Sequence, residues 1–248
     1  PPPPPPPPPP LFFFPPTPPC ELLSGLVGSE MCIRDSRQPT ALVARDPRAS
    51  GEFLEAAVCA GLASAGVDVL RVGVIPTPAA AYLVNEYRTD LGVMLSASHN
   101  PMPDNGIKFF SRGGVKLPDD LEDAIEQRMG EPWARPIGDK VGRIRYTPQA
   151  VDTYVDHLVR SLRQQDTLKG MKIVLDTANG ASFHTATAAF TTQGAEVIAI
   201  HDQPDGLNIN ERCGSCLLYT SPSPRDQRGS GGAGAGWEKK GGGGGGGG

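Results

Sequence analysis

Short apolar runs of strand length alternate with stretches of helical periodicity across the first half of this 248-residue chain. In the first helical stretch, apolar residues recur at helical spacing after Ser50, and Gly66 follows the last of them. In the second, Pro78 stands at the first helical position, where its missing N–H is not needed. The order strand, helix, strand, helix, strand favours a parallel sheet with right-handed crossovers, which is an α/β fold. The expected strands are Ala41–Val43, Val67–Val74 and Leu91–Leu95, and the expected helices lie within Ser50–Gly66 and Pro78–Tyr87.

A hairpin and then a second α/β pattern follow. Ile107–Phe110 and Val115–Leu117, joined through Arg112-Gly113-Gly114, are typical of a β-hairpin. Residues 131–142 hold two prolines and two glycines and are expected to connect two domains. The remaining expected elements are helices at Pro118–Met129, Pro148–Leu162 and Ser182–Thr191 and strands at Lys172–Asp176 and Glu196–Ile200.

The two ends of the chain do not have the composition of a folded protein. Pro1–Pro10 is a proline homopolymer and Gly241–Gly248 is a glycine homopolymer, as runs of cytosine and of guanine would encode. A back-translation of Leu26–Asp35, read as its reverse complement, encodes the string found at Cys216–Asp226. Two protein segments have no physical reason to encode each other's opposite strands, so both ends are interpreted as translated adapter DNA and excluded from the fold. The alternative is a proline-rich linker and a flexible glycine tail. The excluded ranges are 1–36 and 216–248.

Charge, apolar content and cysteines exclude several classes of function. A net charge of −4 and a pI near 5.6 give no electrostatic footprint for nucleic acid. No apolar run approaches the length of a membrane span, so no membrane partner is expected. Cys59 lies in an apolar helical stretch and is expected in the core, whereas the spacing Cys213-x-x-Cys216 is a weak metal signal because Cys216 falls in the excluded end. Nothing indicates disulfides, so a cytoplasmic location is expected.

The loop after the third expected strand concentrates reactive side chains. Residues 96–106 read Ser-Ala-Ser-His-Asn-Pro-Met-Pro-Asp-Asn-Gly, and Ile107 and Lys108 follow. Ligands gather at the carboxyl ends of strands in open α/β sheets, so this is the expected site. A serine can relay a phosphoryl group covalently if a cation neutralises charge and an acid or base moves the proton, and Ser98, Lys108 and His99 supply those types. The alternative is an ordinary solvated turn.

Several strings in this chain resemble the α-D-phosphohexomutase family. Ser-Ala-Ser-His-Asn-Pro at 96–101 and Asp-Asn-Gly-Ile-Lys-Phe-Phe at 104–110 are similar to that family's phosphoserine loop and following strand. Ala-Arg-Asp-Pro-Arg-Ala-Ser-Gly at 44–51 is also similar, although glycine is more usual at Ala44. The resemblance covers 37–215 and is strongest to the bacterial members that act on glucosamine phosphate. Further similar strings are Pro-Thr-Pro at 76–78, Asp-Thr-Ala-Asn-Gly-Ala at 176–181 and Pro-Asp-Gly-Leu-Asn-Ile-Asn at 204–210.

The resemblance implies a domain organisation and an activity. It implies a three-layer α/β/α first domain at residues 37–142 and an incomplete second α/β domain at residues 143–215. The implied activity is that of an isomerase, an intramolecular phosphotransferase that interconverts glucosamine 6-phosphate and glucosamine 1-phosphate through a bisphosphate intermediate. The expected partner is therefore a small phosphosugar. The alternatives are a phosphoglucomutase or phosphomannomutase, or a truncated fragment without catalysis.

The resemblance also assigns roles to individual residues. Ser98 would be the phosphorylated serine that gives its phosphoryl group to the sugar and takes one back. His99 and Lys108 would lie beside it and assist proton transfer and the phosphate charge. Asn100 and Arg45 are the expected substrate-binding residues, with Asn100 helping to shape the loop. For both Arg45 and Arg48, a structural salt bridge remains the alternative to a contact with phosphate.

The resemblance implies a metal ion and an activator, but only part of the metal site is found in this sequence. In the family a magnesium ion bridges the serine phosphate to three aspartates of an Asp-Gly-Asp-x-Asp-Arg loop, and a hexose 1,6-bisphosphate serves as activator. Ser98 would contact Mg²⁺ through its phosphate, but the aspartate string does not occur in this sequence. We therefore expect the chain as written to be inactive. Asp176 and Asp205 are more typical of turn residues than of replacement ligands, and His157, His184 and His201 are interpreted as ordinary histidines.

Overall fold

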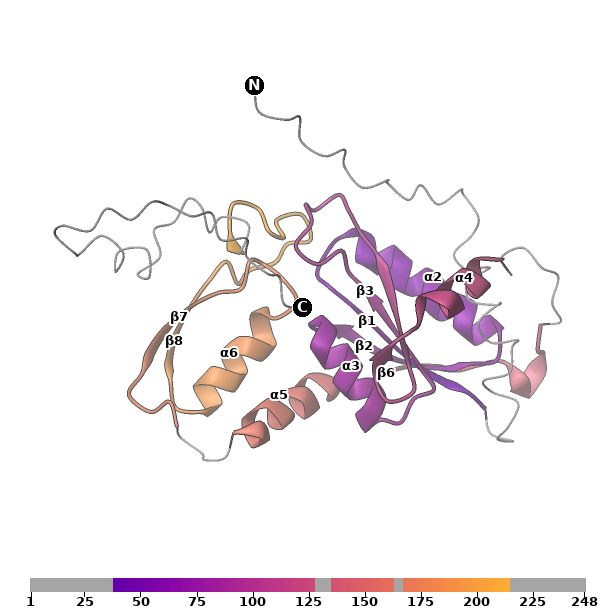
Figure 1. Cartoon of the computed structure of the whole chain (residues 1–248), viewed down its shortest axis with the longest axis horizontal. Helices are drawn as coiled ribbons and strands as arrows, with labels where there is room; N and C mark the ends of the chain where they lie inside the picture. Colours follow the sequence, from indigo (N-terminus) through magenta and orange to yellow (C-terminus); the bar gives the residue numbers. More distant parts are fainter. Residues whose placement is uncertain (1–37, 128–134, 163–166, 215–248) are drawn as a thin grey trace, which may run out of the picture.

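The computed structural model describes residues 38–127, 135–162 and 167–214, so the ranges 1–36 and 216–248 interpreted as adapter lie outside the described residues. The expected elements occur in the expected order, with one further short strand, β6 (Figure 1). The strands are β1 (Thr40–Arg45), β2 (Asp68–Val74), β3 (Leu91–Leu95), β4 (Ile107–Ser111), β5 (Val115–Lys116), β6 (Ile144–Tyr146), β7 (Lys172–Asp176) and β8 (Glu196–Ile200). The helices are α2 (Ser50–Ser64), α3 (Thr77–Glu86), α4 (Asp119–Gln127), the 3₁₀ turn η1 (Gly138–Lys140), α5 (Ala150–Ser161) and α6 (Phe183–Thr192).

The larger sheet has six strands in the order β5-β4-β3-β1-β2-β6. The central strand β1 pairs in parallel with both β2 and β3, and β6 pairs in parallel with β2. β4 runs antiparallel to β3, and β5 runs antiparallel to β4. The predicted parallel sheet and hairpin are therefore confirmed, and the fold class is α/β. Because β1 and β3 are parallel neighbours, the loops that follow them leave the sheet at the same edge.

Both faces of the six-stranded sheet are covered, which makes three layers. Ala41 and Val43 of β1 pack in a core cluster with α2, whereas Leu42 and Ala44 pack in a second cluster with α3 and α5. All four side chains are fully buried. Successive side chains of a strand point to opposite faces, so a strand buried on both sides must be apolar throughout. That requirement explains why this strand is a continuous apolar run.

The smaller unit contains β7 and β8, which pair in parallel, and α6. Helix α5 lies between α6 and α3 and so joins this unit to the six-stranded sheet (Figure 1). Exposure alternates along both strands, and the exposed face carries Val174, Ile198 and Ile200, which are 65%, 43% and 40% exposed. Among the described residues, this sheet is therefore covered by a helix on one face only.

Cys59 is in the core, as the sequence predicts. It is buried in the cluster that α2 forms with the sheet. Burial, together with the smaller effect of the nearby negative charge of Glu55, raises the pKa of its thiol to about 12. Cys59 is therefore an unreactive thiol at neutral pH, because the thiolate is the nucleophilic form. Among the described residues, no helix is long and apolar enough to cross a membrane.

Leu42→Ala tests the importance of the central strand. Leu42 is completely buried between β1 and α3, so its truncation leaves a cavity and should lower the free energy of unfolding by about 2–5 kcal/mol. Urea denaturation followed by circular dichroism measures this change. Phe53→Ala is the control, because Phe53 is 63% exposed on α2 and should change stability by only about 0.5 kcal/mol. Equal effects of the two substitutions would contradict the proposed core.

Candidate active site

The candidate site lies in the loop that connects β3 to β4, at the edge where parallel strands end. The loop begins at Ser96 and ends at Gly106, and it is closed at its base because the Ser96 N–H donates to the Gly106 carbonyl over 2.8 Å. Glycine suits this closure, since a Cβ at residue 106 would lie 3.0 Å from the Ser96 carbonyl oxygen, which is a tight contact. The predicted position of Ser98, exposed and in a loop at the carboxyl end of β3, is the position observed.

Ser98 has a strained backbone conformation. Its φ is +56°, in the left-handed region that residues with a Cβ seldom adopt. Such a conformation costs on the order of 1–3 kcal/mol and persists only where neighbouring contacts hold it. Here the Ser98 N–H donates to the Ser96 hydroxyl over 3.1 Å, and the Ser98 carbonyl accepts bonds from two side chains described below. The result is a fixed turn that presents the Ser98 side chain to solvent.

Arg48 is the main anchor of this loop. It follows β1, is fully buried, and its guanidinium reaches across to the loop after β3. Its Nη2 donates to the carbonyls of Ser98 and Asn100 over 3.1 and 2.9 Å, and its Nη1 donates to the carbonyl of Pro101 over 2.5 Å. Its Nε pairs with the carboxylate of Asp46 over 3.0 Å. A buried charge needs both a counter-ion and hydrogen bonds, and this geometry supplies both.

Two of the predicted site residues follow Ser98 directly. His99 and Asn100 are both exposed in the loop. The Asn100 side chain donates to Asp104 Oδ2 over 3.1 Å, and its carbonyl accepts from the buried arginine. These two bonds hold Asn100 within the loop. Its contact with substrate, and the role of His99 in proton transfer, stay predictions.

Lys108 is on β4, in the strand that leads away from the loop. It is half-buried and lies opposite Met94 of β3 in the antiparallel register. Directly opposed residues project from the same face of a sheet, so Lys108 leaves the sheet on the side of Met94, where α3 packs. The structure thus places Lys108 one residue into the strand after the Ser98 loop, at the same edge of the sheet. Its contact with the phosphate stays a prediction.

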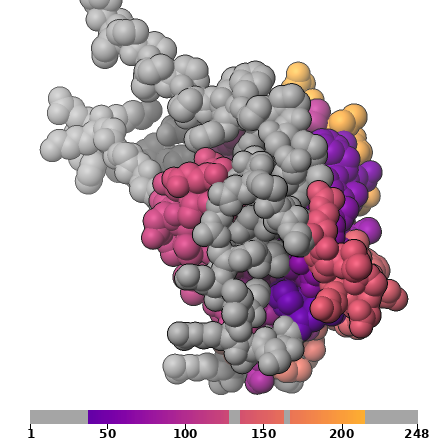
Figure 2. Space-filling view, turned by 90° about the vertical axis from the view of Figure 1, so that its right-hand side faces the viewer, coloured from indigo at the N-terminus to yellow at the C-terminus, as the bar shows by residue number. Residues whose placement is uncertain are grey.

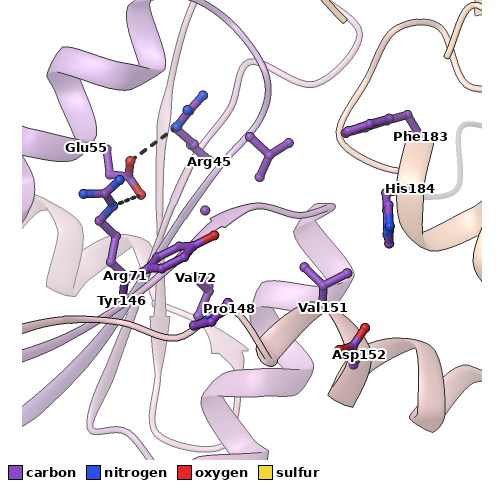
Figure 3. Close-up of a pocket in the computed structure, with 12 residues that line it drawn as sticks. Arg45, Glu55, Arg71, Val72, Tyr146, Pro148, Val151, Asp152, Phe183 and His184 are labelled. Carbon is purple, nitrogen blue, oxygen red and sulfur yellow. Dashed lines mark ion pairs between the residues drawn. The ribbon is translucent and has the colours of Figure 1, made fainter. Parts of the chain in front are cut away.

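Arg45 is bound in an ion-pair network. Its Nε lies 3.4 Å from Glu55 Oε2, and Arg71 Nε lies 3.3 Å from Glu55 Oε1 (Figure 3). The Nη2 of Arg45 also lies 3.8 Å from Glu52 Oε1. The salt-bridge alternative for Arg45 is therefore present, because Glu55 is only 5% exposed and needs the positive charge. Its substrate-binding role stays a prediction.

Arg45 also lines a cavity of about 740 Å³ between the two units. The cavity runs from the ion-pair network to Phe183 and His184 at the start of α6, with Tyr146 and Asp152 along its wall (Figure 3). None of its lining residues belongs to the loop that carries Ser98. The cavity is therefore a feature of the junction between the units rather than part of the predicted phosphoserine site.

Asn210, in the smaller unit, also holds the loop. Its Nδ2 donates to the carbonyls of Ser98 and Asn100 over 3.2 and 3.1 Å. Nearby, the Ala49 N–H donates to the Gly206 carbonyl over 2.9 Å, so the two units meet at this point. In Figure 2 the orange surface of the last described residues adjoins the indigo surface of the first unit. No role was predicted for Asn210, and its one sequence signal was its place in the resembling string at 204–210.

The chain is similar in sequence to known enzymes. Residues 25–133 match the family described as phosphoglucomutase/phosphomannomutase, alpha/beta/alpha domain I. Over these residues the chain is similar to the phosphohexomutases. The match begins at residue 25, inside the range interpreted as adapter, and the domain boundaries stay predictions.

Curated phosphoglucosamine mutases are among the similar proteins. The chain is 58% identical over 186 residues to that of Acidothermus cellulolyticus, covering 75% of this chain and 40% of the relative. It is 61% identical over 186 residues to that of Streptomyces griseus, covering 73% and 41%. The chain therefore spans about 40% of the length of these relatives.

Solved phosphohexomutase structures share the fold. A phosphoglucomutase/phosphomannomutase family protein from Burkholderia thailandensis superposes with a TM-score of 0.61 at 28% identity, covering 76% of this chain and 41% of that one. Parafusin, a phosphoglucomutase from Paramecium, superposes in its open form with a TM-score of 0.55 at 18% identity, covering 75% and 40%. The second likeness, at that identity, concerns the fold alone.

Arg48→Met tests the anchor of the loop that carries Ser98. The change leaves Asp46 buried without its counter-ion and removes three hydrogen bonds to loop carbonyls, so it should lower the free energy of unfolding by about 3–5 kcal/mol. In the same variant, amide hydrogens of residues 98–106 should exchange faster with deuterium. Arg160→Met is the control, because Arg160 is 80% exposed and its pair with Asp156 should contribute less than about 1 kcal/mol. Unchanged exchange in the loop would refute the anchoring role.

Proposed function

We propose that the protein to which this chain belongs is a phosphoglucosamine mutase. It interconverts glucosamine 6-phosphate and glucosamine 1-phosphate through a phosphorylated Ser98 and a bisphosphate intermediate. Identities of 58% and 61% to curated phosphoglucosamine mutases support the choice of sugar. The observation that carries the proposed chemistry is the conformation of Ser98, which is exposed yet held at φ +56° by a buried arginine.

In the proposed chemistry, Ser98 gives a phosphoryl group to one hydroxyl of the sugar and then takes one back from another position of the sugar. A hydroxyl of the sugar phosphate attacks phosphorus of phospho-Ser98, the bond from phosphorus to the Ser98 oxygen breaks, and the hydroxyl proton is taken up by a nearby base. The bisphosphate then turns, and the Ser98 oxygen accepts the other phosphoryl group. His99 is proposed to move the proton and Lys108 to balance the negative charge of the phosphate. A dephosphorylated enzyme is proposed to regain its phosphoryl group from a hexose 1,6-bisphosphate.

Magnesium would neutralise charge on the transferring phosphoryl group, as it does generally in phosphoryl transfer. The described residues do not complete a site for it. Within 38–127, 135–162 and 167–214, no three carboxylates lie close enough together to share an ion. Phospho-Ser98 would supply phosphate oxygens, which suit a hard cation. Of the ligands that the ion would need, the described residues therefore supply only the phosphate oxygens of phospho-Ser98.

A phosphoglucomutase or phosphomannomutase is the second candidate. The matching domain family carries both of those names, and so does the Burkholderia thailandensis structure. Comparing turnover of glucosamine, glucose and mannose 6-phosphates by the full-length enzyme separates the candidates, and a preference for either of the last two sugars would overturn the first proposal.

We propose a cytoplasmic location, supported by the finding that neither Cys59 nor Cys213 is in a disulfide within the described residues.

Ser98→Ala in the full-length enzyme tests the covalent role. Without the hydroxyl no phosphoserine forms, so turnover should fall by about 10³-fold or more. The assay converts glucosamine 6-phosphate in the presence of magnesium and a hexose 1,6-bisphosphate. Ser111→Ala is the matched control, because the Ser111 hydroxyl donates to the Val115 carbonyl within the neighbouring hairpin. Turnover by Ser98→Ala close to that of the control would show that Ser98 is not the acceptor.

The 248-residue chain by itself should have no measurable mutase turnover. It encodes no Asp-Gly-Asp-x-Asp-Arg string, so it lacks the carboxylates expected to hold the metal. Losing a single electrostatic stabiliser typically slows an enzyme by about 10²–10³-fold. The same coupled assay, with the chain at high concentration and Ser98→Ala as background, measures this directly. Turnover clearly above that background would mean that the chain retains more of the site than we propose.

A further inference from the structure

Three potential metal ligands converge at one end of the smaller unit. Asp176 is the last residue of β7, His201 directly follows β8, and Cys213 lies near the end of the described chain. One ligand atom from each of the three lies within 4.8 Å of the other two. The convergence follows from topology, because β7 and β8 are parallel and Asp176 is in register with Ile200. The carboxyl ends of both strands therefore meet, and Cys213, on the segment that follows β8, is the third ligand.

The surrounding hydrogen bonds fix the Asp176 ligand. The Ala178 N–H donates to Asp176 Oδ1 and the Gly214 N–H donates to Asp176 Oδ2, each over 2.9 Å. The first bond is the turn contact expected of an aspartate at a strand end. The second holds the residue after Cys213 against the carboxylate. An ionised carboxylate accepts about four hydrogen bonds or ligand bonds, so these two leave room for an ion.

The histidine and the cysteine are also held in place. The His201 carbonyl accepts bonds from Thr177 Oγ1 over 2.6 Å and from the Asn179 N–H over 2.5 Å, which fixes a backbone at φ +49°. Its Nδ1 lies 3.1 Å from Asp176 Oδ1. Cys213 is 1% exposed, whereas the Asp176 and His201 side chains are 32% and 42% exposed. The cluster thus has a buried thiol on one side and an opening to solvent on the other.

We propose that Asp176, His201 and Cys213 form a binding site for a divalent transition-metal ion with the ligand preferences of Zn²⁺. One sulfur, one imidazole nitrogen and one carboxylate oxygen are ligands that Zn²⁺ takes, and the solvent opening leaves the fourth tetrahedral position to water. Tetrahedral bonds of about 2.0–2.3 Å require ligand atoms roughly 3.5 Å apart, and atoms that lie within 4.8 Å of one another reach that spacing with small side-chain movements. Binding releases the proton of the Cys213 thiol to solvent, and His201 binds through a neutral nitrogen. Mg²⁺ is excluded as the occupant because it prefers oxygen ligands.

An ion at this site would stabilise the contact between the smaller unit and the Ser98 loop. Asn210, which donates to the carbonyls of Ser98 and Asn100, is three residues before Cys213. The ion would tie that segment to the ends of β7 and β8. The proposed role of the ion is therefore structural, and the proposal does not rest on the proposed mutase activity.

Binding of Co²⁺ and Zn²⁺ to the chelator-treated 248-residue chain tests the proposal. Co²⁺ should bind with a sulfur-to-cobalt charge-transfer absorption, and Zn²⁺ should displace it and raise the melting temperature. Cys213→Ser should abolish the absorption, and His201→Gln should weaken the affinity by about 100-fold or more while circular dichroism shows an unchanged fold.

Two matched variants complete the test. Cys216→Ser removes the other cysteine of the Cys213-x-x-Cys216 spacing, and His184→Gln removes a histidine outside the cluster; both should bind Co²⁺ normally. Absence of the charge-transfer absorption in the unmutated chain would overturn the proposal. So would normal binding by a folded His201→Gln variant, or loss of binding in Cys216→Ser, since either result would place the ion elsewhere.

Discussion

The buried ion pair between Arg48 and Asp46 connects the sheet to the loop in which the chemistry is expected. Taking two charges out of water costs several kcal/mol each, and an arginine with one partner would not recover that cost. Three carbonyls of the loop after β3 accept hydrogen bonds from the Nη1 and Nη2 atoms of the guanidinium. The fold therefore gains a satisfied charge only if this loop adopts one conformation, and in that conformation Ser98 is strained and exposed.

The parallel pairing of β1 with β3 makes that contact possible. Because both strands end at the same edge, the segment after β1 carries the arginine directly beneath the loop after β3. The smaller unit reaches the same place from the other side, where Asn210 donates to two of the carbonyls that the arginine also contacts. Two units thus hold one loop, and a change in their relative position would alter the carbonyls around Ser98. This shared contact links the relative position of the two units to the loop in which phosphoryl transfer is proposed.

The local pattern of the sequence predicted the fold better than it predicted the site. The strands and helices around β1 could be predicted, since a doubly buried strand must be apolar throughout and a helix carries its own start and stop signals. β6 was not predicted, because all three of its residues are exposed and show no apolar pattern. Arg48 remained ambiguous between a phosphate contact and a salt bridge, since the three carbonyls that it contacts follow a different strand. The contact of Asn210 with Ser98 spans 112 residues, and no local period encodes such a distance. For the same reason His201 was interpreted as ordinary.

The central claim is that this fixed loop makes Ser98 a phosphoryl acceptor. Tandem mass spectrometry of the full-length enzyme, after incubation with a hexose 1,6-bisphosphate, locates the phosphoryl group to a single residue. Our account predicts one phosphoryl group on Ser98 and none on the neighbouring Ser96, whose hydroxyl is already engaged by the Ser98 N–H. A phosphoryl group on any other residue of an active enzyme, or none at all, would contradict it.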